Sequence, residues 1–350
     1  MFNIKHQILN ILIKTKLQNY LLKRYIIRNK ISGLEELVSV IKSVLDDNLI
    51  ENIRITYRTS ESPETYADII PTLMLARFYA AIGKKVEFVW VTKYPNPKVS
   101  IKRNDIQTNN YFSDQLKLIN MVFLEFDNVS IKTESSYDTK NFFDFNLAIN
   151  KLNQPLYRLA PTILDESIKI WVSGKRNLPE SFYLDYRSKK NNTVAINYRF
   201  STYDKRRNPS ILSFKKDLKF IIKYFPNRTI IIFSDKRGLE KVLESNILLN
   251  FNKKNTKIEM QKSASYSEAV FEVLNSEFFF MRKGGGMCLP LFYSRSSYLI
   301  LDNDFTNFYS RTPTRLLSFS RPDQQFRRII SRFQLRKVLK NSYSYITIKS

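Results

Sequence analysis

The feature that most constrains the fold is the alternation of apolar strand patterns with helix patterns. In the first part of the chain, a β-favouring run at 52–58 precedes a helix pattern at 67–85 and an apolar strand pattern at 86–91. Residues 98–114 are typical of a loop, and a further strand is predicted at 121–126. Strands that alternate with helices predict parallel βαβ units with right-handed crossovers.

The same alternation resumes in the second part of the chain. The expected strands are 193–200, 228–234, 256–260, 277–281 and 296–302, and the expected helices are 210–225, 238–246, 265–276 and 287–295. A polar, lysine-rich stretch at 178–192 marks the boundary between the two parts. The sequence therefore predicts an α/β fold with two Rossmann-like parallel-sheet domains, 35–188 and 189–308, facing a cleft.

Composition restricts the partners and the metal chemistry. The chain has 57 Lys and Arg against 32 Asp and Glu, a formal charge of +25, which favours nucleic acid, anionic lipid or phosphorylated small molecules. Its single cysteine, Cys288, excludes an internal disulfide framework, and its single histidine, His6, leaves no common Cys/His zinc arrangement. These counts fit a reducing, cytoplasmic compartment, and no metal is expected.

Both ends of the chain are basic. Residues 1–34 contain no Asp or Glu and place apolar residues at near-helical spacing between lysines and arginines, as in an amphipathic helix on anionic lipid. A helix packed on the protein's own core explains that pattern equally well. Residues 309–350 are read as a basic C-terminal helix or tail. No apolar run approaches the roughly 20 residues that cross a bilayer, so the expected location is cytoplasmic or peripheral on the inner face of the membrane.

A glycine run is the first feature of possible chemical importance. The stretch Arg282-Lys283-Gly284-Gly285-Gly286-Met287 holds three of the seven glycines in the chain. It stands where a strand gives way to a helix, at the carboxyl end of a parallel strand, where ligands bind in α/β sheets. The backbone N–H groups there favour an anion. The alternative is a tight connection without a ligand, and the run matches neither a Walker loop nor a GxGxxG fingerprint.

Two other strand ends carry polar residues. Arg199 lies at the end of the strand predicted at 193–200, and an arginine at this edge suits bidentate binding of a phosphate. Ser234 and Asp235 follow the next strand and are candidates for hydrogen bonds to a ribose or a base. Asp235 is alternatively a helix N-cap before Gly238.

The order of these segments resembles a known family. Asn197-Tyr198-Arg199 after one strand, Ser234-Asp235 after the next, and the later run ending in three glycines are similar to the donor half of B-type glycosyltransferases. The likeness is greatest to the fucosyltransferase-like branch, over roughly residues 190–302, with weaker agreement over 52–91. The resemblance implies a metal-independent transfer of a hexosyl or fucosyl group from a GDP- or UDP-linked donor, without a further cofactor.

The resemblance also implies the roles of individual residues. Arg199 would bind the diphosphate, and Asp235 the base or the ribose. Gly284, Gly285, Gly286 and Met287 would line the phosphate site, with Asn197, Ser234, Arg282 and Lys283 beside it. The acceptor would be a glycan or a lipid-linked glycan, as in cell-surface polysaccharide synthesis.

The chain departs from the family pattern at two places. Asn197 stands where the family has a histidine, and the loop after the first strand contains no glycine. That loop region instead carries Glu61, Glu64 and Asp68, which are candidates for the general base that deprotonates an acceptor hydroxyl. Carboxylates in a loop are alternatively only solvated.

Three other interpretations stay open. Asp302 and Asp304 form an Asp-x-Asp pair that suits a divalent metal on a nucleotide sugar, but only 46 residues follow, too few for an acceptor region. Arginines interleaved with aromatic residues also suit a single-stranded nucleic-acid-binding protein, although no known motif of that class is present. A catalytically inactive relative that binds a glycan or a nucleotide would show the same order of strands.

Overall fold

The structure is a computed structural model of the 350-residue chain. It describes residues 34–46, 50–61, 66–92, 105–133, 142–152, 154–174, 176–185, 191–200, 208–248, 251, 256–263, 265–282, 289–301, 323–327, 335, 339 and 340. No described helix is long and apolar enough to cross a membrane.

The first half is built on a four-stranded parallel sheet of order β3-β2-β1-β4. Its strands are β1 (Asn52–Arg58), β2 (Lys85–Val91), β3 (Val129–Lys132) and β4 (Phe143–Asp144). Because β4 is only two residues long, the Asn146 side chain extends its pairing with β1. The amide oxygen of Asn146 accepts from the Thr56 N–H at 2.9 Å, and its amide nitrogen donates to the Thr56 carbonyl at 3.1 Å.

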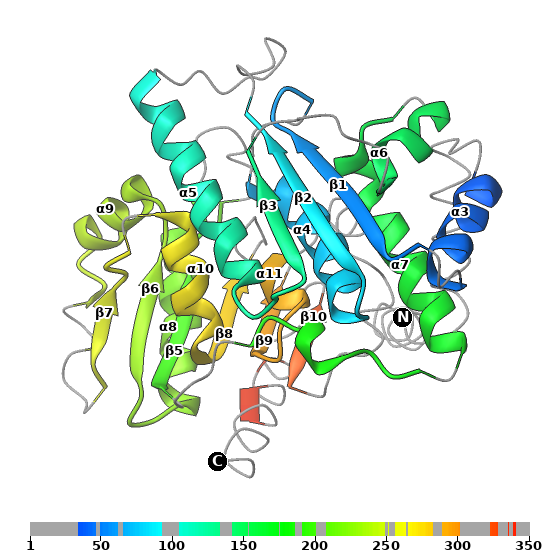
Figure 1. The fold of residues 1–350 in the computed structure, drawn as a ribbon. Coiled ribbons are helices and arrows are strands. Elements are labelled where there is room, and N and C mark those ends of the chain that lie inside the picture. Colours follow the sequence, from blue (N-terminus) through cyan, green and yellow to red (C-terminus); the bar gives the residue numbers. More distant parts are fainter. Residues whose placement is uncertain are drawn as a thin grey trace, which may run out of the picture.

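Helices pack around this sheet. Helices α4 (Tyr66–Ala81) and α5 (Asp105–Phe123) connect its strands, α7 (Leu156–Ser173) packs on α4, and α3 (Leu34–Asp46) packs on α7 (Figure 1). Between the sheet and α7, residues 69–80 of α4 are all buried, as expected of a helix that is apolar on nearly every side. The buried Arg77 is the exception, and its guanidinium donates to the Phe182 and Tyr183 carbonyls. The short elements are α6 (Phe145–Ala148), η1 (Asn150–Leu152) and η2 (Glu180–Phe182).

The second half is a six-stranded parallel sheet of order β10-β9-β8-β5-β6-β7. Its strands are β5 (Asn191–Asn197), β6 (Thr229–Phe233), β7 (Ile258–Met260), β8 (Ser276–Arg282), β9 (Ser297–Leu301) and β10 (Gln324–Arg327). Counted within this half, the order is 3-2-1-4-5-6, which is that of a doubly wound Rossmann sheet. The strand order of the first half, 3-2-1-4, is the beginning of the same pattern.

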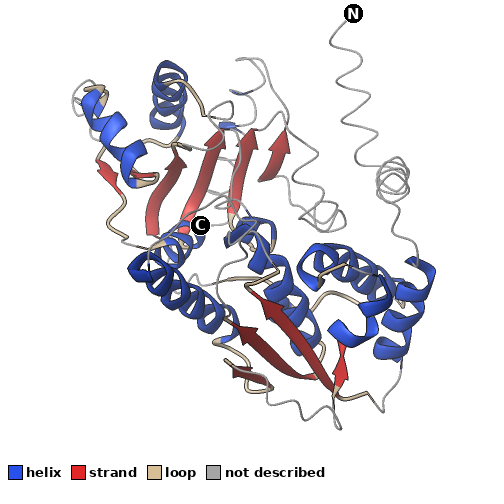
Figure 2. Ribbon diagram, turned by 90° about the horizontal axis from the view of Figure 1, so that it is seen from above, coloured by secondary structure: helices blue, strands red, loops and turns tan. Residues whose placement is uncertain are grey.

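Alternate residues of the six-stranded sheet enter two separate cores. Val194 and Ile196 pack with α8 (Ile211–Tyr224) and α9 (Lys236–Glu244) on one face. Ala195, between them, belongs to the core on the other face, with α10 (Tyr266–Leu274) and α11 (Leu289–Phe292). Figure 2 shows helices on both sides of this sheet. The α10 face shares its core with the first half, so the two sheets are joined by one continuous apolar interior.

The predicted fold class is confirmed, since both sheets are parallel and lie within an α/β arrangement. Two local predictions in the first half were wrong. Residues 105–114 are helical rather than a loop, and 121–123 end α5 rather than begin a strand, which follows only at 129–132. Tyr111, Leu118, Ile119 and Val122 are buried at helical spacing, so the apolar residues after 120 continue the buried face of α5.

The two predicted terminal segments, 1–34 and 309–350, are described only in part. Of the predicted N-terminal helix 1–34, only Leu34 is described, and it begins α3. In the segment read as a C-terminal helix or tail, β10 adds an edge strand that the sequence did not reveal, and Leu335 and Leu339 pack into the α8 core. The predicted domain limits themselves stay predictions.

Candidate functional site

The candidate site is the carboxyl edge of the six-stranded sheet between β5 and β8. These neighbours are the first and fourth strands of the half, so the connections leave them in opposite directions, and ligands bind α/β sheets at such a switch point. Asn197 pairs in register with Met281, so the two strands end together. The sequence predicted Arg199 and Arg282 at this edge. In the structure Arg199 follows the end of β5, and Arg282 is the last residue of β8.

The chain leaving β5 is fixed to the end of β6. The Tyr198 N–H donates to the Phe233 carbonyl at 2.8 Å, and the Tyr198 carbonyl accepts from the Ser234 hydroxyl at 2.6 Å. The Tyr198 ring packs on Phe214 with centroids 4.8 Å apart, and Asn197 is buried beside it. These contacts determine where Arg199 leaves the sheet.

The hydroxyl and the backbone N–H of Ser234 are therefore both hydrogen-bonded within the protein. Its hydroxyl donates to Tyr198, and its backbone N–H donates to the side-chain oxygen of Gln261, after β7, at 3.1 Å. Helix α9 lies so close that a Cβ on Gly238 would be 1.8 Å from the Ser234 Oγ and 2.9 Å from the Phe200 Cβ. Only glycine permits this approach, and Gly238 itself is the one local signal of it in the sequence.

Asp235 is the N-cap of α9. Its carboxylate accepts from the Gly238 N–H at 2.7 Å, which confirms the N-cap interpretation. Desolvation raises the pKa of Asp235, and the Gly238 N–H and the nearby cations Arg237 and Arg199 act in the opposite direction. Arg199 is half-buried, and its guanidinium donates to the Asn208 side-chain oxygen at 3.4 Å. The structure thus brings Arg199 and Asp235 to the same edge.

Arg282, at the end of β8, is bound to an acid that the sequence reading had not singled out. Its guanidinium forms two hydrogen bonds of 2.6 Å with the carboxylate of Asp217, on α8. Burial raises the pKa of Asp217, whereas the bonds and charge of Arg282 lower it. The available signal was an acid between Phe214 and Leu218 on the apolar face of α8. Much of the positive charge expected from Arg282 is therefore compensated within the protein.

Several predicted residues lie outside the described part of the chain. These are Glu64, Lys283, Gly284, Gly285, Gly286, Met287, Asp302 and Asp304. Asp68 is described only by its backbone, in the first turn of α4. Glu61 is half-exposed in the turn after β1 and forms a 3.5 Å ion pair with Arg58. No described group of three or more His, Cys, Asp or Glu residues is arranged to hold a metal ion.

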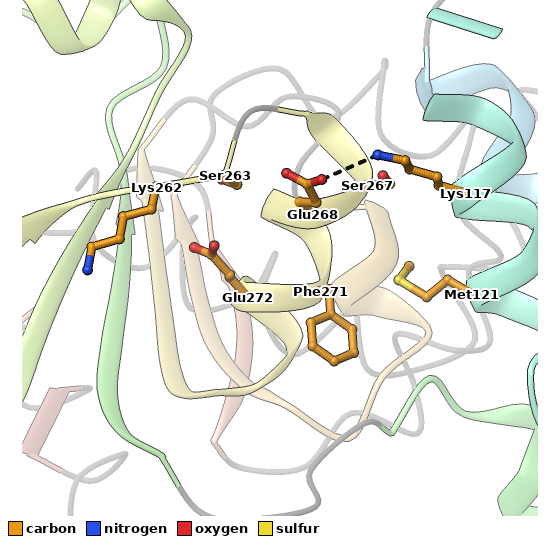
Figure 3. A pocket seen from close by; sticks show the side chains of 8 residues that line it. All are labelled: Lys117, Met121, Lys262, Ser263, Ser267, Glu268, Phe271 and Glu272. Atoms are coloured by element: carbon orange, nitrogen blue, oxygen red, sulfur yellow. Dashed lines mark hydrogen bonds and ion pairs between the residues drawn. The ribbon is translucent and has the colours of Figure 1, made fainter. Parts of the chain in front are cut away.

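A pocket of about 390 Å³ lies where the two halves meet, between α5, α10 and the segment after β7 (Figure 3). Its lining consists of Lys117, Met121, Lys262, Ser263, Ser267, Glu268, Phe271 and Glu272. The Lys117 ammonium and the Glu268 carboxylate are 3.4 Å apart at its edge, and Met121 and Phe271 form an apolar part of the wall. The Ser263 hydroxyl is buried, and none of the described residues forms a hydrogen bond with it.

Two glutamates of this pocket, Glu268 and Glu272, lie one turn apart on α10. Burial raises the pKa of Glu272, the negative charge of Glu268 raises it further, and Lys262 opposes the shift. One residue of the lining, Lys262, directly follows Gln261, whose side chain binds the Ser234 N–H at the carboxyl edge. The sequence reading did not find this pocket, because its residues come from both halves.

The pocket borders a polar joint between the halves. Asp114 on α5 accepts from the N–H groups of Tyr266 and Ser267, at 3.1 and 3.2 Å, and from the Ser267 hydroxyl. A carboxylate at the N-terminus of α10 satisfies N–H groups that have no partner within the helix. This joint fixes α10 of the second half against α5 of the first.

The comparisons with known proteins give no family. No family model matches the chain, and no curated protein matches it. A solved alpha-glucosyltransferase in complex with UDP-glucose and DNA containing an abasic site is 11% identical with a TM-score of 0.31, over 84% of this chain and 95% of that chain. An alpha-glucosyltransferase with UDP and a 13-mer DNA containing a HMU base is 12% identical over the same shares, with a TM-score of 0.30.

A third solved structure is that of a universal stress protein from Archaeoglobus fulgidus. It is 14% identical with a TM-score of 0.18, over 70% of this chain and 91% of that chain. The fold class rests on the two parallel sheets and their strand orders.

Proposed function

We propose that the protein is a glycosyltransferase that moves a sugar from a nucleotide-diphosphate donor to a glycan or lipid-linked acceptor, in cell-surface polysaccharide synthesis. The observation that supports this most is the switch point between β5 and β8. Tyr198 and Arg199 follow the end of β5, on one side of this point. Arg282 ends β8, on the other side, and Lys283 and three glycines follow it in the sequence. A ligand rich in phosphate suits this edge.

In the proposed reaction, the protein promotes transfer by positioning the donor and by compensating the negative charge on its diphosphate. The Arg199 guanidinium offsets the charge that develops on the departing diphosphate, and the backbone N–H groups of Gly284–Gly286 contribute to the same effect. Removing one such donor from a preorganised site costs about 3 kcal/mol of transition-state stabilisation. The hydrogen bond from the Ser234 hydroxyl to the Tyr198 carbonyl holds the chain from which Arg199 follows. A carboxylate among Glu61, Glu64 and Asp68 acts as the general base.

The proposed transfer is metal-independent, of the hexosyl or fucosyl type, and uses a GDP- or UDP-linked donor. The support is Arg199 at this edge, next to the switch point, together with Lys283, which follows β8 in the sequence. Cations of the protein replace a divalent metal in this scheme. The fucosyltransferase-like order of segments in the sequence supports the same scheme.

The test is thermal unfolding of the full chain with GDP, UDP, CMP and their sugars. A ligand at a hundredfold excess over its dissociation constant adds about 2.7 kcal/mol to the free energy of unfolding. We expect one base to stabilise the wild type and Arg199→Ala to lose about tenfold in affinity, as when a charge-assisted hydrogen bond is removed. Arg158→Ala, an exposed arginine on α7, is the matched control.

Two results would reject the proposal. The first is a protein stabilised by no nucleotide but by single-stranded RNA, which favours the nucleic-acid-binding alternative. The second is the same nucleotide affinity in Arg199→Ala as in the wild type. Nucleotide binding without sugar transfer to any acceptor would instead identify an inactive relative.

A further inference from the structure

Helix α8 exposes one continuous cationic stripe. Leu212, Lys216, Lys219 and Lys223 recur at spacings of four, three and four residues, so they share one face of the helix. All four are exposed, and Leu212 is 67% exposed. Phe214, Leu218 and Ile221 occupy the opposite, buried face. At about 1.5 Å per residue the stripe is roughly 16 Å long.

The three lysines are not compensated by acids of the described residues. Elsewhere in the described chain, Lys117, Lys132, Lys169 and Lys257 each pair with a glutamate. The ion pairs within the described part of the chain include none with Lys216, Lys219 or Lys223. The one acid of α8, Asp217, is buried and bound to Arg282. The exposed face of α8 therefore carries three lysines and one leucine, and no exposed acid of its own.

The position of the stripe in the fold leaves it accessible. Helices α8 and α9 cover the face of the six-stranded sheet opposite to the one that shares its core with the first half. Because α8 follows β5, Leu212 lies at the carboxyl end of the sheet and Lys223 at the other end. The exposed leucine thus marks the end of the stripe nearest the candidate site.

We propose that the α8 stripe docks the protein on an anionic lipid surface, with Leu212 entering the interface between head groups and acyl chains. A straight row of lysines with an exposed leucine suits a flat anionic surface, where each lysine adds electrostatic attraction and the leucine adds apolar burial. Single-stranded nucleic acid instead needs aromatic side chains on which bases stack, and the stripe has none. Docking in this way lays α8 along the membrane, with Leu212 at the carboxyl end of the sheet.

The docking proposal does not depend on sugar transfer. If the proposed transferase function is also correct, the geometry favours a lipid-linked acceptor, because the stripe begins at the edge where β5 and β8 end. Vesicle binding and nucleotide binding are separate measurements. Failure of either proposal is therefore visible without the other.

The experiment is co-sedimentation of the full chain with vesicles of phosphatidylcholine, with or without 30% phosphatidylglycerol. A lysine near an anionic surface contributes about fivefold to membrane partitioning. We expect Lys216→Glu/Lys219→Glu to weaken binding to the anionic vesicles by roughly thirtyfold or more. Lys42→Glu/Lys85→Glu, which alters two exposed lysines of the first half by the same charge, is expected to change binding less than threefold. Leu212→Ser is expected to weaken binding several-fold, and this loss persists at high salt.

Three results would overturn the proposal. They are a wild-type protein that does not bind anionic vesicles, equal effects of the two double variants, and binding unchanged in the α8 variants. The last result would assign lipid binding to other segments, such as the basic ends. Loss of single-stranded RNA binding in Lys216→Glu/Lys219→Glu with unchanged vesicle binding would show that the stripe is a nucleic-acid surface instead.

Discussion

Asp114, on α5 of the first half, accepts hydrogen bonds from the N–H and the hydroxyl of Ser267 at the start of α10 in the second half. Both residues are buried, so the carboxylate is a fixed part of the joint between the sheets. The pocket of Figure 3 lies beside this joint. This carboxylate therefore adds a buried polar contact to the apolar interior that joins the two halves.

Asp114→Asn should destabilise the protein by about 2 kcal/mol. The amide keeps the shape of the side chain, but it loses the charge that the helix N-terminus favours and replaces one acceptor oxygen with a donor. Urea denaturation of the purified chain measures the change. Asp127→Asn, at an exposed aspartate, should change the free energy of unfolding by less than about 0.5 kcal/mol. Equal midpoints for the two variants would contradict a stabilising joint.

Gly238→Ala should destabilise the second half by about 2 to 3 kcal/mol. The added Cβ would lie 1.8 Å from the Ser234 Oγ, so α9 must move or the Ser234 bond to Tyr198 must break. Gly174→Ala is the control, because its nearest neighbour is the Trp171 carbonyl oxygen at 3.4 Å. Thermal unfolding compares the two. A Gly238→Ala protein as stable as Gly174→Ala would disprove the close approach of α9.

The pKa of Glu272 predicts a pH dependence of stability. Burial and the charge of Glu268 raise this pKa above its ordinary value of 4.5, so the folded state binds more protons than the unfolded state just above that pH. The free energy of unfolding contributed by this group is therefore full below pH 4.5 and falls as the pH rises through the folded pKa. Glu272→Gln should show a smaller decrease between pH 4.5 and 7 than the wild type. Glu240→Gln, on α9, is the control, and an identical decrease in all three proteins would count against the prediction.

The elements of the second half could be predicted from the sequence because local signals agree there. The helix predicted at 210–225 and the strand at 228–234 match α8 and β6 to within one residue at each end. Each has an apolar period that fits one structure, and Ser210 caps α8 as its residue type suggests. The alternation of strands and helices then predicted that the sheet is parallel.

Contacts between segments far apart in the chain could not be predicted in the same way. Asp217 and Arg282 are 65 residues apart, and Asp114 and Ser267 are 153 apart. No local period reveals such pairs, because each depends on how α5, α8 and α10 pack on the sheets. The start of α5 was also missed, since Asn109 and Asn110 do not favour a helix locally and tertiary packing of Tyr111 outweighs that preference.

Because Arg282 is paired with Asp217, a structural role of Arg282 can be measured separately from a role in binding. Arg282→Gln alone should lower the free energy of unfolding by about 3 kcal/mol, because it leaves a buried carboxylate without its partner. Asp217→Asn/Arg282→Gln removes both charges and should recover most of that loss. Chemical denaturation of the two single variants and the double variant gives the coupling energy.

Nucleotide affinity in the same double variant decides the role of Arg282. Because Asp217 already compensates its charge, removal of the pair leaves the net charge of the carboxyl edge unchanged. We expect the affinity for the stabilising nucleotide to stay within threefold of the wild type, whereas Arg199→Ala loses about tenfold. A stable double variant with an equally large loss would show that Arg282 contacts the ligand, as the sequence alone predicted.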